Sequence, residues 1–208
     1  MWTSSLFNKI ISELGYSSYL ELGVAAGNCW DNVLCEFKTG VDSTNDTMWH
    51  LQNVISKTTD EYFESIKKSS SKFDLVYIDA YHEKYQVYRD FCNSLNHLND
   101  GGIVVFHDIY PLKKEDTNIH TANGNVYEFW IELVNDYNDH TYVIEGEPGH
   151  HEGTVGIYVN PHKNFNKDLI LEINHSYEYF SENIDKYIFG KIVNETEIIE
   201  KIKKANQK

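Results

Sequence analysis

The sequence alternates short apolar runs with segments whose apolar residues recur at helical spacing, and this alternation restricts the chain to an α/β fold. The clearest run, Phe73–Ile78, is typical of a parallel strand buried on both faces. A helix is expected over about 83–98, with Val87, Phe91 and Leu95 on one face, and a strand over 103–106 follows it. We therefore expect a mostly parallel sheet with helices on both faces.

The other elements are placed by the same spacing and by glycine or proline stops. Strands are expected over about 19–22, 39–42, 54–58, 142–144 and 154–159, and helices over about 6–14, 28–36, 44–52, 60–67 and 126–135. The first helix follows Thr3-Ser4-Ser5, which resembles an N-terminal cap, and Asn99-Asp100-Gly101-Gly102 is a predicted stop between the 83–98 helix and the next strand. The last two strands leave no room for a helix between them, so they should pair antiparallel.

The length of 208 residues predicts a single domain over 1–208. Its core is expected over about 17–160, and 161–208 is expected to be a mostly helical extension. Asn194–Glu197 resembles a capping box that begins a terminal helix. We expect this tail to serve as a packing or oligomerisation surface, so the sequence leaves open whether the protein forms a homo-oligomer.

Composition excludes several functional classes. Acidic residues number 32 against 18 basic ones, a formal charge of −14, so a nucleic-acid partner is not expected. Three cysteines, at spacings that match neither a zinc knuckle nor a disulfide framework, favour a reducing compartment. No apolar segment has the length of a signal peptide core or a membrane span, so we expect a soluble, cytoplasmic protein with no membrane partner.

Polar side chains follow the expected strands in succession, at the edge where an open parallel sheet binds ligands. In chain order they are Glu21 with Gly23 and Gly27, Asp42, Thr59 and Asp60, Asp79 with His82, and His107 with Asp108. A single carboxylate after a strand is often only a helix cap, but a series at one edge indicates a binding site.

The turn after the first strand reads Glu-Leu-Gly-x-x-x-Gly over 21–27, which differs from the G-x-G-x-x-G of dinucleotide folds. The sequence also has no G-x-x-x-x-G-K-[ST] motif, so both NAD and ATP are disfavoured. A glycine turn framed by acids suits a ligand with a positive centre and neutral hydroxyls, and Asp42 is placed to accept from a ribose diol. A nucleoside sulfonium meets this description.

Four segments together resemble the successive motifs of class I S-adenosylmethionine-dependent methyltransferases. They are YLELGVAAG, TGVD, FDLVYIDAYH and GGIVVFHD, and the likeness covers about 17–160. Within that superfamily, Asp79–His82 and the GGIVVFHDIYP strand resemble the methyltransferase domain 24 group, near small-molecule O-methyltransferases. The resemblance implies a Rossmann-like, doubly wound sheet of about seven strands with the last antiparallel, and S-adenosylmethionine as cofactor.

Carried over by position, the resemblance implies a cofactor-binding set. Glu21, Gly23 and Gly27 would hold the methionine end, Asp42 the ribose, and Asp60 would lie near the adenine. Ala25, Ser43, Thr59 and Asp79 complete the implied set. The implied partner is a small-molecule methyl acceptor, such as a sugar or secondary metabolite.

A divalent metal is implied by the metal-dependent relatives, in which an acid after the fourth strand and an acidic pair after the fifth bind magnesium. The matching residues here are Asp79, His107 and Asp108, with His107 in place of an acid. Imidazole suits manganese or zinc better than magnesium, so the sequence leaves open both which metal binds and whether one does.

His82 resembles the catalytic base of metal-dependent sugar methyltransferases, with Asp79 beside it. An unperturbed imidazole titrates near about 6.5, which suits a general base. A metal that lowers the pKa of the acceptor hydroxyl is an open alternative for deprotonation. The alternative to a catalytic role for His82 is that it only caps the helix after it.

Further segments are candidates for the acceptor site. The long polar loop 111–125, which includes His120, is a candidate lid, and the turn Glu147–Glu152 should rim the pocket. The aromatics Tyr81, Tyr85, Tyr110, Tyr127 and Trp130 could line an acceptor site or belong to the core. Two rival functions remain: a catalytically silent S-adenosylmethionine-binding protein, and another Rossmann-like enzyme such as a nucleotide-dependent oxidoreductase.

Overall fold

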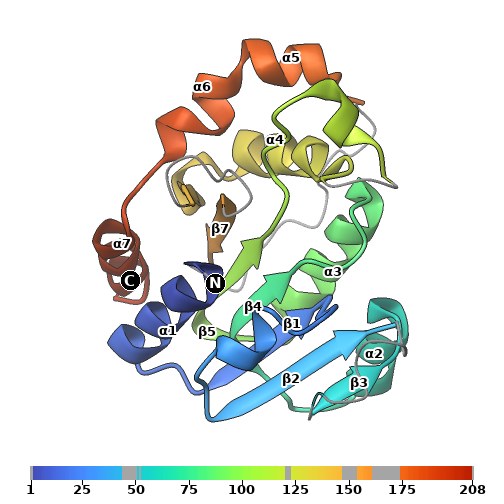
Figure 1. The fold of residues 1–208 in the computed structure, drawn as a ribbon. Helices are drawn as coiled ribbons and strands as arrows, with labels where there is room; N and C mark the ends of the chain where they lie inside the picture. The colour runs from blue at the N-terminus through green and yellow to red at the C-terminus, as the bar shows by residue number, and fades with distance from the viewer. Residues whose placement is uncertain are drawn as a thin grey trace.

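The computed structural model describes residues 2–43, 51, 53–119, 123–146, 154–160 and 174–207. The strands are β1 (Ser18–Leu22), β2 (Phe37–Asp42), β3 (Val54–Ser56), β4 (Phe73–Ile78), β5 (Leu98–Phe106), β6 (Thr141–Ile144) and β7 (Val155–Val159). The α-helices are α1 (Trp2–Leu14), α2 (Thr59–Ile66), α3 (Lys84–Asn96), α4 (Val126–Asp136), α5 (Tyr177–Glu182), α6 (Ile184–Tyr187) and α7 (Glu195–Ala205). Figure 1 shows their arrangement.

The strands form one seven-stranded sheet in the order β3-β2-β1-β4-β5-β7-β6. The β1, β2, β3, β4 and β5 strands pair in parallel, whereas β7 pairs antiparallel with both β5 and β6. This confirms the expected seven strands and the antiparallel pairing of the last two. The strand order reverses between β1 and β4, and such a switch point is where open α/β sheets bind ligands.

The sheet is covered on both faces, as the apolar β4 run predicts. Val76 and Ile78 face one buried cluster, which includes side chains of α2, α3 and α4. Leu75 and Tyr77, which alternate with them, face a second cluster built with α1 and α7. The period-two alternation of a strand explains why one sequence run supplies both layers.

The terminal helix α7 packs on its own chain, beside α1 (Figure 1). Asn194 and Glu197 form the expected capping box, and Ile198, Ile199 and Ile202 are buried. The packing role expected for this part of the tail is therefore confirmed. No helix in the described parts of the chain is long and apolar enough to span a membrane.

The prediction of a helix over 28–36 is wrong, because the structure has only a 3-10 turn there, η1 (Trp30–Asn32). Asn8 of α1 donates from Nδ2 to the Asn32 carbonyl, and its Oδ1 accepts from Leu34 N. Trp30 is buried against α1 and β1. These tertiary contacts take the backbone groups that a helix would use, so they override local helix propensity.

Two other boundaries differ from expectation. Thr3 and Ser4 lie inside α1 and are buried, so they are not an N-terminal cap. The 99–102 segment lies within β5 rather than before it. In the pairing of β4 with β5, Phe73 pairs with Leu98 and Leu75 pairs with Ile103, so the register shifts and 99–102 are included in the strand. The helix expected over 44–52 lies almost wholly outside the described residues.

Truncating a buried α7 side chain should destabilise the whole domain. Ile202→Ala is expected to lower the free energy of unfolding by about 2–5 kcal/mol, because it leaves a cavity between α7 and α1. Urea unfolding followed by circular dichroism measures this change. Glu200→Ala, on the exposed face of the same helix, is the control and should change stability by no more than about 0.5 kcal/mol. Equal stability of the two variants would contradict the packing of α7.

Candidate active site

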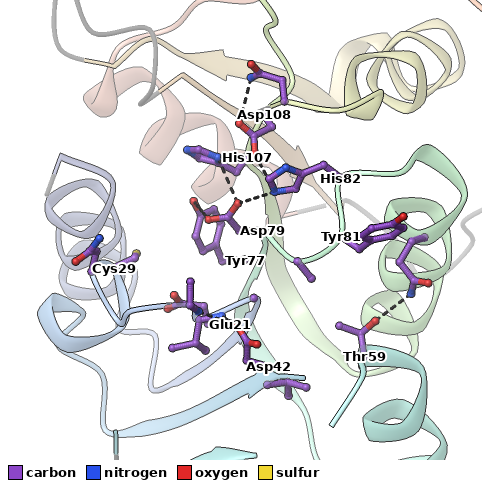
Figure 2. A pocket seen from close by; sticks show the side chains of 18 of the residues that line it. Glu21, Cys29, Asp42, Thr59, Tyr77, Asp79, Tyr81, His82, His107 and Asp108 are labelled. Carbon is purple, nitrogen blue, oxygen red and sulfur yellow. Dashed lines mark hydrogen bonds and ion pairs between the residues drawn. The ribbon is translucent and has the colours of Figure 1, made fainter. Parts of the chain in front are cut away.

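A cavity of about 1470 Å³ opens where β1, β2, β4 and β5 end. Sites for one small molecule usually have about 300–1000 Å³, so this cavity has room for two reactants. Eleven of the twelve residues that the sequence predicts for the site line it: Glu21, Gly23, Ala25, Asp42, Ser43, Thr59, Asp60, Asp79, His82, His107 and Asp108. Figure 2 shows several of them from close by.

Gly27 is the predicted residue that is not among the described residues of the cavity wall. Its φ is +82°, and a Cβ there would lie 2.8 Å from Leu51 Cδ2 and 3.3 Å from Asp31 Oδ2. Gly27 therefore lets the turn pack closely against Leu51 and Asp31, outside the described cavity wall. A role in touching the cofactor stays a prediction.

Gly23 lets the turn after β1 lie in close contact with the turn after β4. Its φ is +88°, and a Cβ there would lie 2.0 Å from the Asp79 carbonyl oxygen. Any side chain at this position would force the turn after β1 away from the turn after β4. Glycine is therefore required here by the packing of the chain, in addition to any contact with a cofactor.

Asp42 at the end of β2 organises the same turn. Its Oδ2 accepts hydrogen bonds from Val24 N at 2.9 Å and Ala25 N at 2.8 Å. Ala25 has a φ of +45°, an uncommon conformation for a residue with a Cβ, and these bonds help hold it there. The Asp42 side chain thus both lines the cavity and fixes its wall.

Glu21 is almost fully buried in the cavity wall. The Tyr19 hydroxyl donates to Glu21 Oε2 at 2.6 Å, and Cys29 Sγ lies 3.9 Å from the same hydroxyl. Burial raises the pKa of Glu21 to about 8, although the bond from Tyr19 and the charge of Lys38 act in the opposite direction. A cationic ligand in the cavity would favour the ionised form of this carboxyl.

Four side chains, which we call the Asp-His cluster, point toward one another (Figure 2): Asp79, His82, His107 and Asp108. His82 Nε2 lies 3.1 Å from Asp108 Oδ2 and 3.6 Å from Asp79 Oδ1. His107 Nδ1 lies 3.0 Å from the same Asp108 oxygen and 3.3 Å from the same Asp79 oxygen. Each carboxylate oxygen is therefore shared by two imidazoles.

The carboxylates and the imidazoles of the cluster stabilise each other's charged forms. Burial disfavours ionisation of Asp79, yet the His107 and His82 rings outweigh it and hold the pKa of Asp79 well below its usual range. Burial also disfavours a charged His107, yet the Asp79 and Asp108 carboxylates raise the pKa of His107 well above its ordinary value. A positively charged ring beside two carboxylates is thus stable in this cavity.

His82 does not cap the helix that follows it, so that alternative is wrong. The N-cap of α3 is Glu83, whose side chain accepts from Gln86 N. The His82 ring instead faces the two carboxylates of the cluster. This leaves His82 placed for chemistry in the cavity.

The donor atoms of the cluster fit a divalent cation. In the described chain, Asp79, His82 and Asp108 offer ligand atoms that lie within 4.8 Å of one another. The sequence predicts Asp79, His107 and Asp108, and His107 Nδ1 lies as near to the two carboxylates as His82 Nε2 does. Donors around a tetrahedral ion at about 2.0–2.1 Å lie about 3.3–3.4 Å apart, close to the spacings of the cluster. Two imidazoles with two carboxylates suit zinc or manganese better than magnesium.

The cavity wall also includes Tyr81, Tyr110, Leu112, Lys113, Asp116 and Asn123. Of the aromatics named as candidates, Tyr81 and Tyr110 line the cavity, whereas Tyr127 and Trp130 belong to the core. Tyr85 is exposed and does not appear in the described wall.

The described parts of the predicted lid are 111–119 and 123–125, and the first of them is hydrogen-bonded to α5. The Tyr177 hydroxyl donates to the Leu112 carbonyl at 2.7 Å, and Lys114 Nζ donates to Glu178 Oε1 at 2.7 Å. His120 and the turn Glu147–Glu152 lie outside the described residues.

Sequence reasoning missed several residues of the wall, among them Trp2, Thr3, Cys29 and Gln86. Gln86 Nε2 lies 2.9 Å from Thr59 Oγ1, 3.2 Å from Asp60 Oδ1 and 3.0 Å from Asp90 Oδ1. Its place between the starts of α2 and α3 carries no local motif. Trp2 and Thr3 reach the cavity only because α1 packs over the end of β1, which the sequence pattern does not specify.

Buried Glu21 should make stability depend on pH. The folded protein keeps a proton on Glu21 up to about pH 8, whereas a free glutamate loses it near 4.5. The folded state therefore binds more protons in this window, so the free energy of unfolding falls as pH rises through it. Glu21→Gln should give a smaller fall in melting temperature between about pH 5 and 8 than the parent chain shows.

The control for this prediction is Glu36→Gln, at an exposed position, which should leave the pH slope unchanged. Asp90 contributes in the same direction, because burial raises its pKa to about 7. The slope of Glu21→Gln should therefore be reduced rather than abolished. A slope identical to that of the parent chain would contradict the buried, protonated state of Glu21.

Comparison with known proteins finds similarity to methyltransferases. Residues 20–109 match the family model described as a methyltransferase domain. No curated protein matches the sequence. The matched segment begins within β1 and ends three residues after β5, so it contains all twelve residues of the predicted site.

Solved structures share the fold at low sequence identity. The N-methyltransferase NodS from Bradyrhizobium japonicum WM9 is 15% identical, with 77% of this chain and 94% of that chain covered and a TM-score of 0.52. An O-methyltransferase from Bacillus cereus in complex with SAH is 15% identical, with 76% and 81% covered and a TM-score of 0.53. The O-methyltransferase TomG from Streptomyces achromogenes in complex with SAM is 14% identical, with 76% and 79% covered and a TM-score of 0.52. The chain therefore has the fold of these solved methyltransferases, and its residues 20–109 are similar to a methyltransferase domain.

Proposed function

We propose that the chain transfers a methyl group from S-adenosylmethionine to a hydroxyl or amine of a small molecule. The observation that carries the proposal is one cavity, large enough for two reactants, that joins the acidic glycine turn to the Asp-His cluster. The first part suits a nucleoside sulfonium and the second can take up a proton. Transfer requires these two functions side by side.

The cofactor end is assigned by charge and placement. Glu21 and Asp42 put carboxylates near the turn after β1, which favours the ammonium and sulfonium of the cofactor. Asp42 accepts from the ribose diol, while Gly23, Ala25, Gly27 and Ser43 shape or line the turn. In this proposal Thr59 and Asp60 contact the adenine and Asp79 stands between cofactor and acceptor; all three line the cavity.

His82 is the base in this proposal. As the acceptor oxygen attacks the methyl carbon, the carbon–sulfur bond breaks and S-adenosylhomocysteine leaves. The acceptor proton passes to the His82 imidazole, and the resulting cation is stabilised by Asp108 at 3.1 Å and Asp79 at 3.6 Å. A carboxylate pair beside an imidazole favours its charged form, so the pair assists proton uptake.

The Asp-His cluster would also hold a divalent metal, with Asp79 and Asp108 as carboxylate donors and His82 or His107 as the imidazole donor. A bound ion would lower the pKa of the acceptor hydroxyl. In both cases Asp79 and Asp108 act at the same place, between the cofactor end and the acceptor end.

The rival functions predict different behaviour. A silent binding protein would bind the cofactor without transfer, and a nucleotide-dependent oxidoreductase would prefer a nicotinamide. The Asp-His cluster in the cavity favours the enzyme over the silent binder, and the turn without a dinucleotide motif disfavours the oxidoreductase.

Calorimetry tests the proposal directly. Metal-stripped protein is titrated with S-adenosylhomocysteine and with NADH, alone and with magnesium, manganese or zinc. Binding of S-adenosylhomocysteine is then followed by transfer of a labelled methyl group to a panel of small hydroxylated and amino acceptors. Absence of S-adenosylhomocysteine binding under every condition would remove the proposed function.

Removing His82 should impair the chemical step. His82→Ala is expected to lower kcat by about 10²-fold or more, because the general base is lost. The Kd for S-adenosylhomocysteine should stay within about threefold, since the ring faces the Asp-His cluster rather than the glycine turn. The control His140→Ala, in η3 away from the cavity wall, should keep full turnover. Unchanged turnover in His82→Ala would remove the residue from the mechanism.

Removing Asp42 should instead weaken cofactor binding. Asp42→Ala loses both the expected ribose contact and the two bonds that hold the turn, so binding should weaken by about 1–3 kcal/mol. Calorimetry with S-adenosylhomocysteine measures the change, with the exposed Asp136→Ala as the matched control. An unaltered Kd would refute this placement of the cofactor.

A further inference from the structure

The candidate base His82 is held by a turn that lies far from it in sequence. Asn125 N donates to the His82 carbonyl oxygen at 3.1 Å. Asn125 Oδ1 accepts from Lys84 N at 2.8 Å, so one residue contacts the backbone on both sides of Glu83. The place of the His82 backbone is thereby tied to the residues that precede α4.

Gly124 also lies directly against His82. A Cβ at Gly124 would lie 2.0 Å from the His82 carbonyl oxygen and 2.6 Å from His82 Cβ. The φ of Gly124 is +56°, in the left-handed region that favours glycine. A side chain at this position would therefore displace the segment that carries the imidazole.

A buried polar network fixes the same turn. Lys84 Nζ, almost fully buried, lies 3.0 Å from Glu128 Oε2 and 2.5 Å from Asn174 Oδ1. Asn125 Nδ2 lies 3.3 Å from Glu128 Oε1, and His175 N donates to Glu128 Oε2 at 3.1 Å. Breaking a buried ion pair is costly, so α3, α4 and the segment before α5 keep a fixed relation around the turn.

We propose that Gly124 and Asn125 are positioning residues, which set where the His82 imidazole stands between Asp79 and Asp108. The inference rests on the proposed function, because positioning matters for turnover only if His82 takes the acceptor proton. It adds that residues outside the four strand-end motifs, on the loop before α4, control the reaction. A misplacement of a base by about 1 Å can lower a rate by about 10²-fold.

The experiment compares two glycines with left-handed backbones. Gly124→Ala meets His82, whereas Gly15→Ala, at a φ of +67°, meets no atom within 4 Å. Both substitutions place a Cβ on a strained backbone, but only the first touches the candidate base. We expect Gly124→Ala to lower kcat by about tenfold or more, and Gly15→Ala to stay within about twofold of the parent chain.

A double-mutant cycle separates positioning from a general structural effect. In the His82→Ala background, Gly124→Ala should change kcat by no more than about twofold, because the residue it acts through is already absent. The Kd for S-adenosylhomocysteine should stay within about threefold throughout. A further tenfold loss in the His82→Ala background would overturn the proposal, as would full turnover in Gly124→Ala alone.

The position of the ring is also measured without turnover. In a carbon–proton NMR spectrum of the ten histidine rings, the His82 signal is the one lost in His82→Ala. Gly124→Ala should shift this signal and Gly15→Ala should not, whether or not methyl transfer is detected. Failure of the positioning inference and failure of the proposed function are therefore distinguishable.

Asn125→Ala is the second variant, in case Gly124→Ala does not fold, which its melting curve reports. It removes the acceptor for Lys84 N but keeps the backbone donor to His82. We expect a shifted His82 ring signal and a fall in kcat that again disappears in the His82→Ala background. An unshifted signal with unchanged kcat would overturn the role of Asn125.

Discussion

The backbone contact between Gly23 and Asp79 is the constraint on which the rest of the site depends. Gly23 N donates to the Val41 carbonyl and Asp79 N donates to the Leu22 carbonyl, so the end of β1 is bonded to both neighbouring strands. With no Cβ in the way, the turns after β1 and β4 meet at the switch point of the sheet. This close approach makes one continuous wall from the glycine turn to the Asp-His cluster, so the proposed cofactor site and the proposed base line one cavity.

Charge is balanced differently at the two ends of that wall. Glu21 is buried with a hydrogen bond from Tyr19, and burial raises its pKa, so this end gains from a cationic ligand. The Asp79 carboxylate instead has imidazoles around it, which hold its pKa well below the usual range despite its burial. One end is therefore suited to bind a cation, and the other is suited to accept a proton or a metal ion.

The parts of the chain after the family match are integrated with the site rather than appended to it. The network around Lys84 and Glu128 reaches Asn174, and α5 is bonded to the loop that lines the acceptor end. On the opposite face, α7 packs on α1, whose first residues line the cavity. Both faces of the sheet thus connect the C-terminal extension to the region where the two reactants would meet.

The sequence by itself determined the elements and the edge at which they act. Continuous apolar runs such as Phe73–Ile78 specify strands buried on both faces, and the residues after them must meet at one edge because parallel strands share a direction. That argument found eleven of the twelve predicted residues in one cavity. Other features depend on contacts between segments that are far apart in the sequence, and only the tertiary structure determined them. Hydrogen bonds with Asn8 take backbone groups of the helix expected over 28–36, and Gly27 packs against Leu51 and Asp31. His82 joins the predicted donors Asp79, His107 and Asp108 in one cluster. These outcomes rest on packing and on hydrogen bonds between segments far apart in the chain, which local spacing does not encode.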